Sequence, residues 1–242
     1  EINSEKRKTK RSQKMATIAK RKTNLPSGDF GIPDDYHIDI AQEDIKVPSV
    51  ILLQKMTELV ELEDINWKAG QFYDMGTDSV IDSFDALVVS YYVTARLLGE
   101  KDPKTGRAEA LRFSSDGKHW DDDGSVIQPD EFKWKEDGQF AKKSFHYLVL
   151  IRGTDMPTIV TFKGASAKMA KHLNMHLMRT KPSWRSYFHF QSTQEETNGN
   201  KYYVMKANPQ PKDTCDQDTA DLCIGFWEMS QQTRISSSEM TA

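Results

Sequence analysis

Cysteine is nearly absent from this sequence, which has only Cys215 and Cys223 among its 242 residues. Two thiols are too few for a four-thiolate zinc site or for the disulfide framework of a small secreted domain, and leave open only one disulfide between them. No stretch approaches the roughly 20 apolar residues that cross a bilayer, and the basic N-terminal stretch lacks the apolar centre of a secretory signal. We therefore expect a cytosolic protein in a reducing compartment.

Motifs for nucleotide-driven or metal chemistry are also missing. Neither GxxxxGK[ST] nor GxGxxG occurs, which argues against ATP-driven work. His172 and His176 are spaced like metal ligands on a helix, but Leu173 stands where a metalloprotease has its glutamate, and a third ligand is missing. Carboxylates cluster between Asp116 and Asp137, within turn sequences, and keep a magnesium-dependent nuclease as an alternative. We expect a protein that is not an enzyme and that has no metal and no cofactor.

Positive charge is concentrated in one part of the chain. The net charge is −3, yet residues 141–190 contain nine Lys or Arg and a single acid, Asp155. Rings are interleaved with these cations, namely those of Tyr147, Trp184, Tyr187, His189, Tyr202 and Tyr203. Cations replace phosphate counterions and ring faces stack on unpaired bases. The block therefore predicts a surface that holds single-stranded nucleic acid.

Composition divides the chain into four segments. Residues 1–24 contain nine basic and two acidic residues without hydrophobic periodicity, which predicts a disordered basic arm. Residues 25–48 are rich in Pro, Gly and Asp, as an extended linker is. Residues 49–207 form the expected folded domain. Residues 208–242 are expected to be a flexible tail with one short apolar segment.

Periodicity predicts the elements of the domain. Residues 84–98 alternate as a long half-buried strand. Every second residue from Leu87 to Leu97 falls on one face, and Tyr92 and Arg96 fall on the other. Further strands are expected over 145–152, 158–163, 184–192 and 201–206, and a hairpin turn at 198–200 joins the last two. Residues 165–179 have helical spacing. The pattern is therefore mainly β with one central helix.

A long loop insertion is expected over residues 100–141, where turn signals follow one another. It contains Trp120 and Trp134, which either anchor the loop to the domain or form stacking platforms for bases. We favour anchors, because a buried indole stabilises a loop strongly.

This order of elements fits the five-stranded oligonucleotide-binding (OB) barrel, although periodicity alone also allows another small α+β sheet. The segments VPSVILLQKMTE, GQFYD, LRFSSDG, FHYLVLI, TFKGASAKMAKHLN and NGNKYYV, in this order, resemble a family of bacteriophage single-stranded DNA-binding proteins with an OB barrel. The resemblance covers about two thirds of the chain. It implies a mainly β, OB-fold-like domain that coats single-stranded DNA in phage replication or recombination, in the cytoplasm of the infected bacterial host.

The resemblance has two exceptions. Relatives often carry cysteines, suggestive of a metal, in the loop that corresponds to residues 112–144; this sequence has none there, so no zinc is expected. Many relatives end in an acidic tip that recruits partners, whereas here the acids of the tail precede a final ISSSEMTA. Contacts with other phage replication or recombination proteins, and a homo-oligomer, therefore stay open.

The predicted nucleic-acid contacts are cations and rings on the outward positions of these elements. They are Tyr92, Arg96, Arg152, Lys163, Lys168, Lys171, Trp184, Arg185, Tyr187, His189, Lys201 and Tyr203. The alternatives to single-stranded DNA binding are the nuclease and a phage structural or interaction protein whose basic block contacts an acidic partner.

Overall fold

The structure is a computed structural model that describes residues 47–55, 57, 67–101, 108–133 and 138–239, without the side chains of 101 and 232–239. The basic arm expected over 1–24 and nearly all of the linker expected over 25–48 lie outside the described residues, as does Trp134. Within the described part, no helix is long and apolar enough to cross a membrane.

The described strands form one nine-stranded sheet in the order β3-β2-β1-β7-β6-β4-β8-β9, with β5 paired to β4. They are β1 (Ser49–Leu52), β2 (Phe72–Asp74), β3 (Ser79–Ile81), β4 (Ser83–Lys101), β5 (Ala108–Ser114), β6 (Phe140–Ile151), β7 (Pro157–Phe162), β8 (Ser186–Thr197) and β9 (Asn200–Thr214). Only the pairing of β1 with β7 is parallel among these neighbours. A mainly β fold is thus confirmed, but the sheet has open ends at β3 and β9 and the OB barrel is not confirmed.

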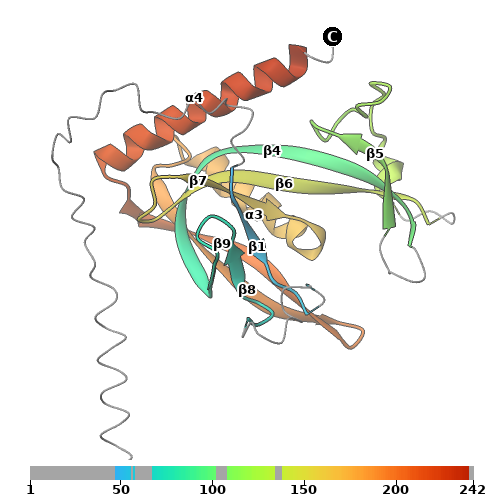
Figure 1. The fold of residues 1–242 in the computed structure, drawn as a ribbon, viewed down its shortest axis with the longest axis horizontal. Coiled ribbons are helices and arrows are strands. Elements are labelled where there is room, and N and C mark those ends of the chain that lie inside the picture. Colours follow the sequence, from blue (N-terminus) through green and yellow to red (C-terminus); the bar gives the residue numbers. More distant parts are fainter. Residues whose placement is uncertain (1–46, 56, 58–66, 102–107, 134–137, 240–242) are drawn as a thin grey trace, which may run out of the picture. The chain divides into compact units, whose positions relative to one another are not determined.

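β4 is the long bent strand on which the sheet is built (Figure 1). It pairs with β8 near its start, with β6 along most of its length and with β5 near its end. Its register against β6 shifts between Val88 and Ser90. Such a bulge moves the following side chains to the other face. Leu87 and Tyr91, expected on one face, therefore lie on opposite faces.

Helix α3 (Ala167–Arg179) covers one face of the sheet. Its length agrees with the helix predicted over 165–179, and it buries Ala170 and Leu173. The strand residues beneath it include Val88, Tyr147 and Phe162. Fully burying a side chain such as Leu173 contributes about 1.5–3 kcal/mol. This face therefore carries the main hydrophobic core.

Helix α4 (Gln217–Glu239) covers part of the opposite face (Figure 1). Its fully buried Cys223 packs with Leu87, Leu150 and Tyr187, and the partly buried Phe226 joins them. Residues 208–242, expected as a flexible tail, thus contain the end of β9 and this helix. The apolar residues over 222–229 were the sequence signal for it.

Both cysteines belong to the cluster beneath α4 and are free thiols. Burial raises the pKa of the Cys223 thiol to about 12 and also raises the pKa of Cys215. Thiolate is the reactive form of cysteine. At neutral pH both residues therefore behave as apolar packing groups.

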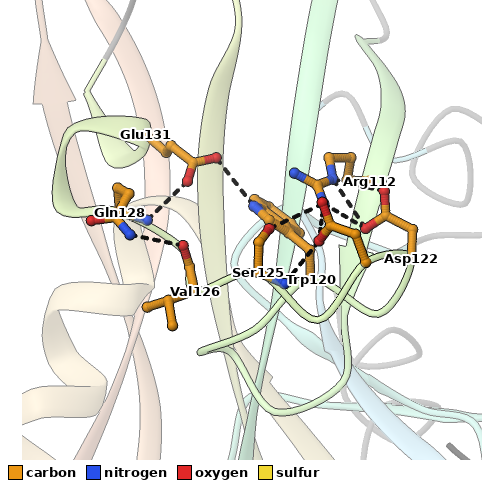
Figure 2. Close-up of polar contacts among 8 residues, drawn as sticks. Arg112, Trp120, Asp122, Ser125, Val126, Gln128 and Glu131 are labelled. Atoms are coloured by element: carbon orange, nitrogen blue, oxygen red, sulfur yellow. Dashed lines mark hydrogen bonds and ion pairs between the residues drawn. The ribbon is translucent and has the colours of Figure 1, made fainter.

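The excursion between β5 and β6 is anchored by Trp120, whose side chain is 1% exposed (Figure 2). The indole Nε1 donates a hydrogen bond to Glu131 in the 3-10 helix η3 (Pro129–Phe132) at 3.2 Å, and the Arg112 guanidinium lies 5.0 Å from a ring centroid. Arg112 is held in turn by Asp122 at 2.7 Å. The interpretation of Trp120 as an anchor is confirmed.

The hairpin predicted at residues 198–200 is also confirmed. β8 and β9 pair from Thr197 and Asn200 onwards, and both turn residues have positive φ, 51° at Asn198 and 78° at Gly199. Two positive φ values in succession define the tight turn that suits twisted strands, and Asn-Gly is the pair that adopts it at least cost.

Candidate nucleic-acid interface

The face of the sheet opposite α3 is only partly covered by α4. Beyond that helix, this face becomes polar, basic and exposed. Three rows of cross-strand neighbours define it: Thr161, His146 and Tyr92; then Ser144 and Thr94; then Lys142, Arg96 and Phe113. Lys163, two residues after Thr161 on the same side of the chain, completes it. We call these nine residues the basic face. They come from β7, β6, β4 and β5, with Lys163 directly after β7.

The basic face combines cations with accessible rings. Arg96, Lys142 and Lys163 are exposed, while the Tyr92 and Phe113 side chains are 37% and 42% exposed. The Arg96 guanidinium lies over the Phe113 ring, 5.8 Å from its centroid. No carboxylate stands among the nine residues. The face is therefore positive and offers flat apolar surfaces between its charges.

His146 lies at the centre of the basic face, where both ring nitrogens bond to hydroxyls. Nε2 is 2.9 Å from Oγ1 of Thr94, and Nδ1 is 2.9 Å from Oγ1 of Thr161. The ring also stacks on Tyr92 at 4.6 Å, with 11° between the planes. A hydroxyl can donate or accept, so the two hydroxyls suit either neutral tautomer, and both can accept from the imidazolium. The ring is thus fixed in place whatever its protonation state.

Burial lowers the pKa of His146, and the charges of Arg96 and Lys163 lower it further. Because the folded-state pKa lies below the value in the unfolded chain, protonation opposes folding. The His146 contribution to stability is therefore present above about pH 6.5 and is lost as the pH falls through the folded-state pKa. Protonation of His146 is therefore opposed by two cations of the same face.

Three of the predicted contacts, Tyr92, Arg96 and Lys163, belong to the basic face. Four others, Arg152, Trp184, Tyr187 and His189, gather instead at the part of the sheet beneath and beside α4. Tyr187 is only 8% exposed and packs in the α4 cluster, and Trp184 packs against that cluster. The outward positions of the strand over 184–192 were expected to face solvent. Tyr187 instead packs in the α4 cluster and His189 is partly buried, whereas Arg185 is exposed.

Arg152 is held by a network rather than projecting freely. Its guanidinium lies 3.8 Å from the Tyr187 ring centroid and pairs with Asp213 on β9. Asp85 accepts a hydrogen bond from Gln210 and pairs with Nδ1 of His189 at 2.8 Å. The network joins β4, β8 and β9 just before the chain enters α4. We interpret it as structural.

Replacing Arg152 by alanine is expected to lower the free energy of unfolding by about 1–2 kcal/mol. The change removes a cation–π contact worth about 0.5–1 kcal/mol and partly exposed ion pairs worth up to about 1 kcal/mol. Urea unfolding followed by tryptophan fluorescence measures it. Arg185→Ala, at an exposed position before β8, is the control and should change stability by less than about 0.5 kcal/mol. Equal effects of the two substitutions would contradict a structural network.

The remaining predicted contacts lie elsewhere. Lys168 and Lys171 project from α3, on the opposite side of the sheet, and Lys168 pairs with Glu195 at 2.7 Å. Lys201 is exposed at the β8–β9 hairpin. The Tyr203 ring packs so close to Gly70 that a Cβ added there would lie 2.4 Å from it. The predicted set is therefore divided between two faces and one hairpin.

Carboxylates of the excursion make bonds that hold its turns. Burial raises the pKa of Asp116, but hydrogen bonds from the side chain and backbone of His119 and from the backbone of Lys118 outweigh burial and hold the pKa well below its usual range. Asp121 accepts from Ser115, and Asp122 from Arg112. In the described part of the chain, no three His, Cys, Asp or Glu residues are grouped to hold a metal ion.

Six of the nine residues of the basic face were absent from the predicted contacts: Thr94, Phe113, Lys142, Ser144, His146 and Thr161. Lys142 and His146 are two of the alternate positions of β6, opposite Arg96 and Tyr92. The sequence carried a signal for them in the polar residues that precede the apolar run of that strand. Phe113 reaches the site only because β5 pairs with the far end of β4.

The fold and its exposed surface define an open, mainly β protein with a basic, ring-bearing sheet face. Comparison with protein families found a match over residues 34–235 to the Pam3 phage gp34-like protein family. Because the match spans most of the chain, the protein belongs to this family of phage proteins. Searches of curated proteins and of solved structures found no match.

Proposed function

We propose that this phage protein binds single-stranded DNA, without catalysis and largely without sequence preference, through the basic face. The observation that carries the proposal is the presence of Arg96, Lys142 and Lys163 around the exposed rings of Tyr92 and Phe113 on one open sheet surface. Cations that neutralise phosphates and rings that stack on bases are the two requirements of single-strand binding. The mode of binding is that of an OB-type sheet face, without a closed barrel.

A single strand suits this face better than a duplex. Bases in a duplex are stacked on one another, so their faces are not available to Tyr92 or Phe113. An unpaired base can instead stack on a ring, which contributes about 1–3 kcal/mol per base. The place of action that we propose is phage DNA replication or recombination in the cytoplasm of the infected host.

A titration with single-stranded DNA, duplex DNA and RNA, each at two salt concentrations, tests this function. Tyrosine and tryptophan emission should be quenched by single-stranded DNA, with weaker binding to the duplex. The logarithm of the affinity should fall with the logarithm of salt by about 0.7 for each phosphate contact. No binding at low salt, or a preference for duplex, would refute the proposal, and cleavage of labelled DNA with magnesium would support the nuclease instead.

The affinity for single-stranded DNA is expected to rise as the pH falls from about 7.5 to 5. Phosphates bound at Arg96 and Lys163 reduce the positive field on His146, so binding favours its protonated form and takes up a proton. Fluorescence anisotropy across this pH range measures the change.

His146→Gln is the control for this pH dependence. Glutamine can still hydrogen-bond to Thr94 and Thr161 but does not titrate, and its affinity should change less with pH. The same pH profile in both proteins would exclude His146 as the titrating group.

The alternative of a structural or interaction protein uses the same surface for a different partner. The basic face would then bind an acidic protein surface. The titration separates the two functions, because a protein that binds only an acidic protein surface would show neither quenching by single-stranded DNA nor cleavage of DNA. That result would favour this alternative.

A further inference from the structure

Two outer helix surfaces are left uncovered by the sheet, and their chemistry is complementary. The outer surface of α3 is basic: the helix contains Lys168, Lys171 and Arg179, and no acid. It also exposes two flexible apolar side chains, Met175 at 52% and Met178 at 79%. Exposed methionine is typical of surfaces that bind another helix, because its unbranched thioether adapts to the partner.

The outer surface of α4 has the opposite sign. Among its described side chains, over residues 217–231, the charged groups are Asp218, Asp221 and Glu228, and Lys and Arg are absent. Leu222, Ile224 and Trp227 are 40%, 42% and 42% exposed. A helix that is apolar on several sides is typically buried in an assembly. The apolar side chains of α4 that pack in the cluster against the sheet are Cys223 and Phe226. Packing in that cluster therefore does not explain Leu222, Ile224 and Trp227.

The surface of α4 also has a shape that fits a methionine side chain. Residues 218, 221, 222, 225, 226 and 229 line an open hollow, and a Cβ added at Gly225 would meet nothing within 4 Å. The hollow thus has an apolar floor with Asp218 and Asp221 beside it. Met178, next to Arg179 on α3, has the matching arrangement of an apolar knob beside a cation.

We propose that α4 of one copy binds the outer surface of α3 in a second copy, with Met175 and Met178 against Leu222 and the hollow at Gly225. Within one copy the two helices pack on opposite faces of the sheet. Each chain can therefore bind one neighbour through its α3 surface and another through its α4 surface. Such a heterologous contact generates a ring or an open chain of subunits rather than a symmetric dimer. The proposal is independent of DNA binding.

Sedimentation velocity of the full chain, from 1 to 200 μM at low and high salt, tests the contact. The weight-average mass should rise with concentration past that of a dimer, and salt should weaken the association, because part of the attraction is between charges. A protein that stays monomeric at 200 μM and low salt overturns the proposal.

Two charge-reversed variants test which surfaces meet. One carries Lys171→Glu with Arg179→Glu on α3, and the other carries Asp218→Lys with Asp221→Lys on α4. Each variant alone should associate at least tenfold more weakly than the wild type, since its two surfaces then have the same sign. An equimolar mixture should associate again, because wild-type α4 of the first meets wild-type α3 of the second.

The outcomes of this test are decisive. All four positions are exposed, and unchanged circular dichroism and melting temperature will show that both variants are folded. If the α3 variant associates like the wild type, α4 binds another surface and the proposal fails. It also fails if the mixture remains dissociated.

Discussion

Replacing Arg96, Lys142 and Lys163 together by alanine is expected to lower the affinity for single-stranded DNA about 500-fold at about 50 mM salt. Each phosphate contact on a single strand contributes about 0.7 to the slope of log affinity against log salt. Loss of three contacts therefore reduces the slope by about 2. With about 1 M salt taken as the point at which these contacts no longer contribute, this slope corresponds to a loss of affinity of about 500-fold at about 50 mM salt. Anisotropy titrations of a short labelled oligonucleotide measure both quantities.

The control removes the same charge from other surfaces. Lys118, Lys201 and Lys212 are exposed in the excursion, at the β8–β9 hairpin and on β9, outside the basic face. Their triple alanine variant should bind within about threefold of the wild type, because only long-range attraction is lost. Equal losses in the two variants would mean that net charge, and not the basic face, determines binding.

Trp120→Ala is expected to cost about 3–5 kcal/mol, the range for removing a large buried aromatic side chain. The indole is the centre of a small cluster with Ala95, Ile127 and Ala141, and the Arg112 guanidinium lies over it. Removing it leaves a cavity and takes away the hydrogen bond to Oε2 of Glu131. Urea unfolding followed by far-ultraviolet circular dichroism measures the loss.

Two matched substitutions separate the loss of packing at Trp120 from the loss of its hydrogen bond and from the effect of any substitution in the excursion. Trp120→Phe keeps most of the apolar volume but loses the bond to Glu131, and should cost less than Trp120→Ala. Val126→Ala, in the same excursion at a side chain that is 56% exposed, should change stability by less than about 0.5 kcal/mol. A loss below about 1 kcal/mol for Trp120→Ala would contradict its role as an anchor.

The two predictions concern neighbouring parts of the molecule. β5 contributes Phe113 to the basic face, and Asp121, next to Trp120, donates its backbone N–H to the Phe113 carbonyl at 3.0 Å. Removing the Trp120 anchor should therefore also loosen the Phe113 end of the basic face. If DNA binding is through this face, Trp120→Ala will weaken it as well as lowering stability.

The sequence by itself determined the elements whose signals are local. The alternation of residues 84–98 predicted β4, helical spacing over 165–179 predicted α3, and Asn198-Gly199 predicted the turn between β8 and β9. Trp120 was identifiable as an anchor because an indole in a polar loop is rarely left in water. Each of these features depends on neighbours within a few residues.

Only the tertiary structure decided which of those elements share a surface. The bulge between Val88 and Ser90 reverses the faces of β4, and α4 covers Tyr187, so alternation alone assigned that ring to solvent. Residues far apart in the chain, such as Phe113 and Lys163, come together through strand pairing. Periodicity gives the two sides of a strand but not the layer that covers each side, because that layer depends on long-range packing.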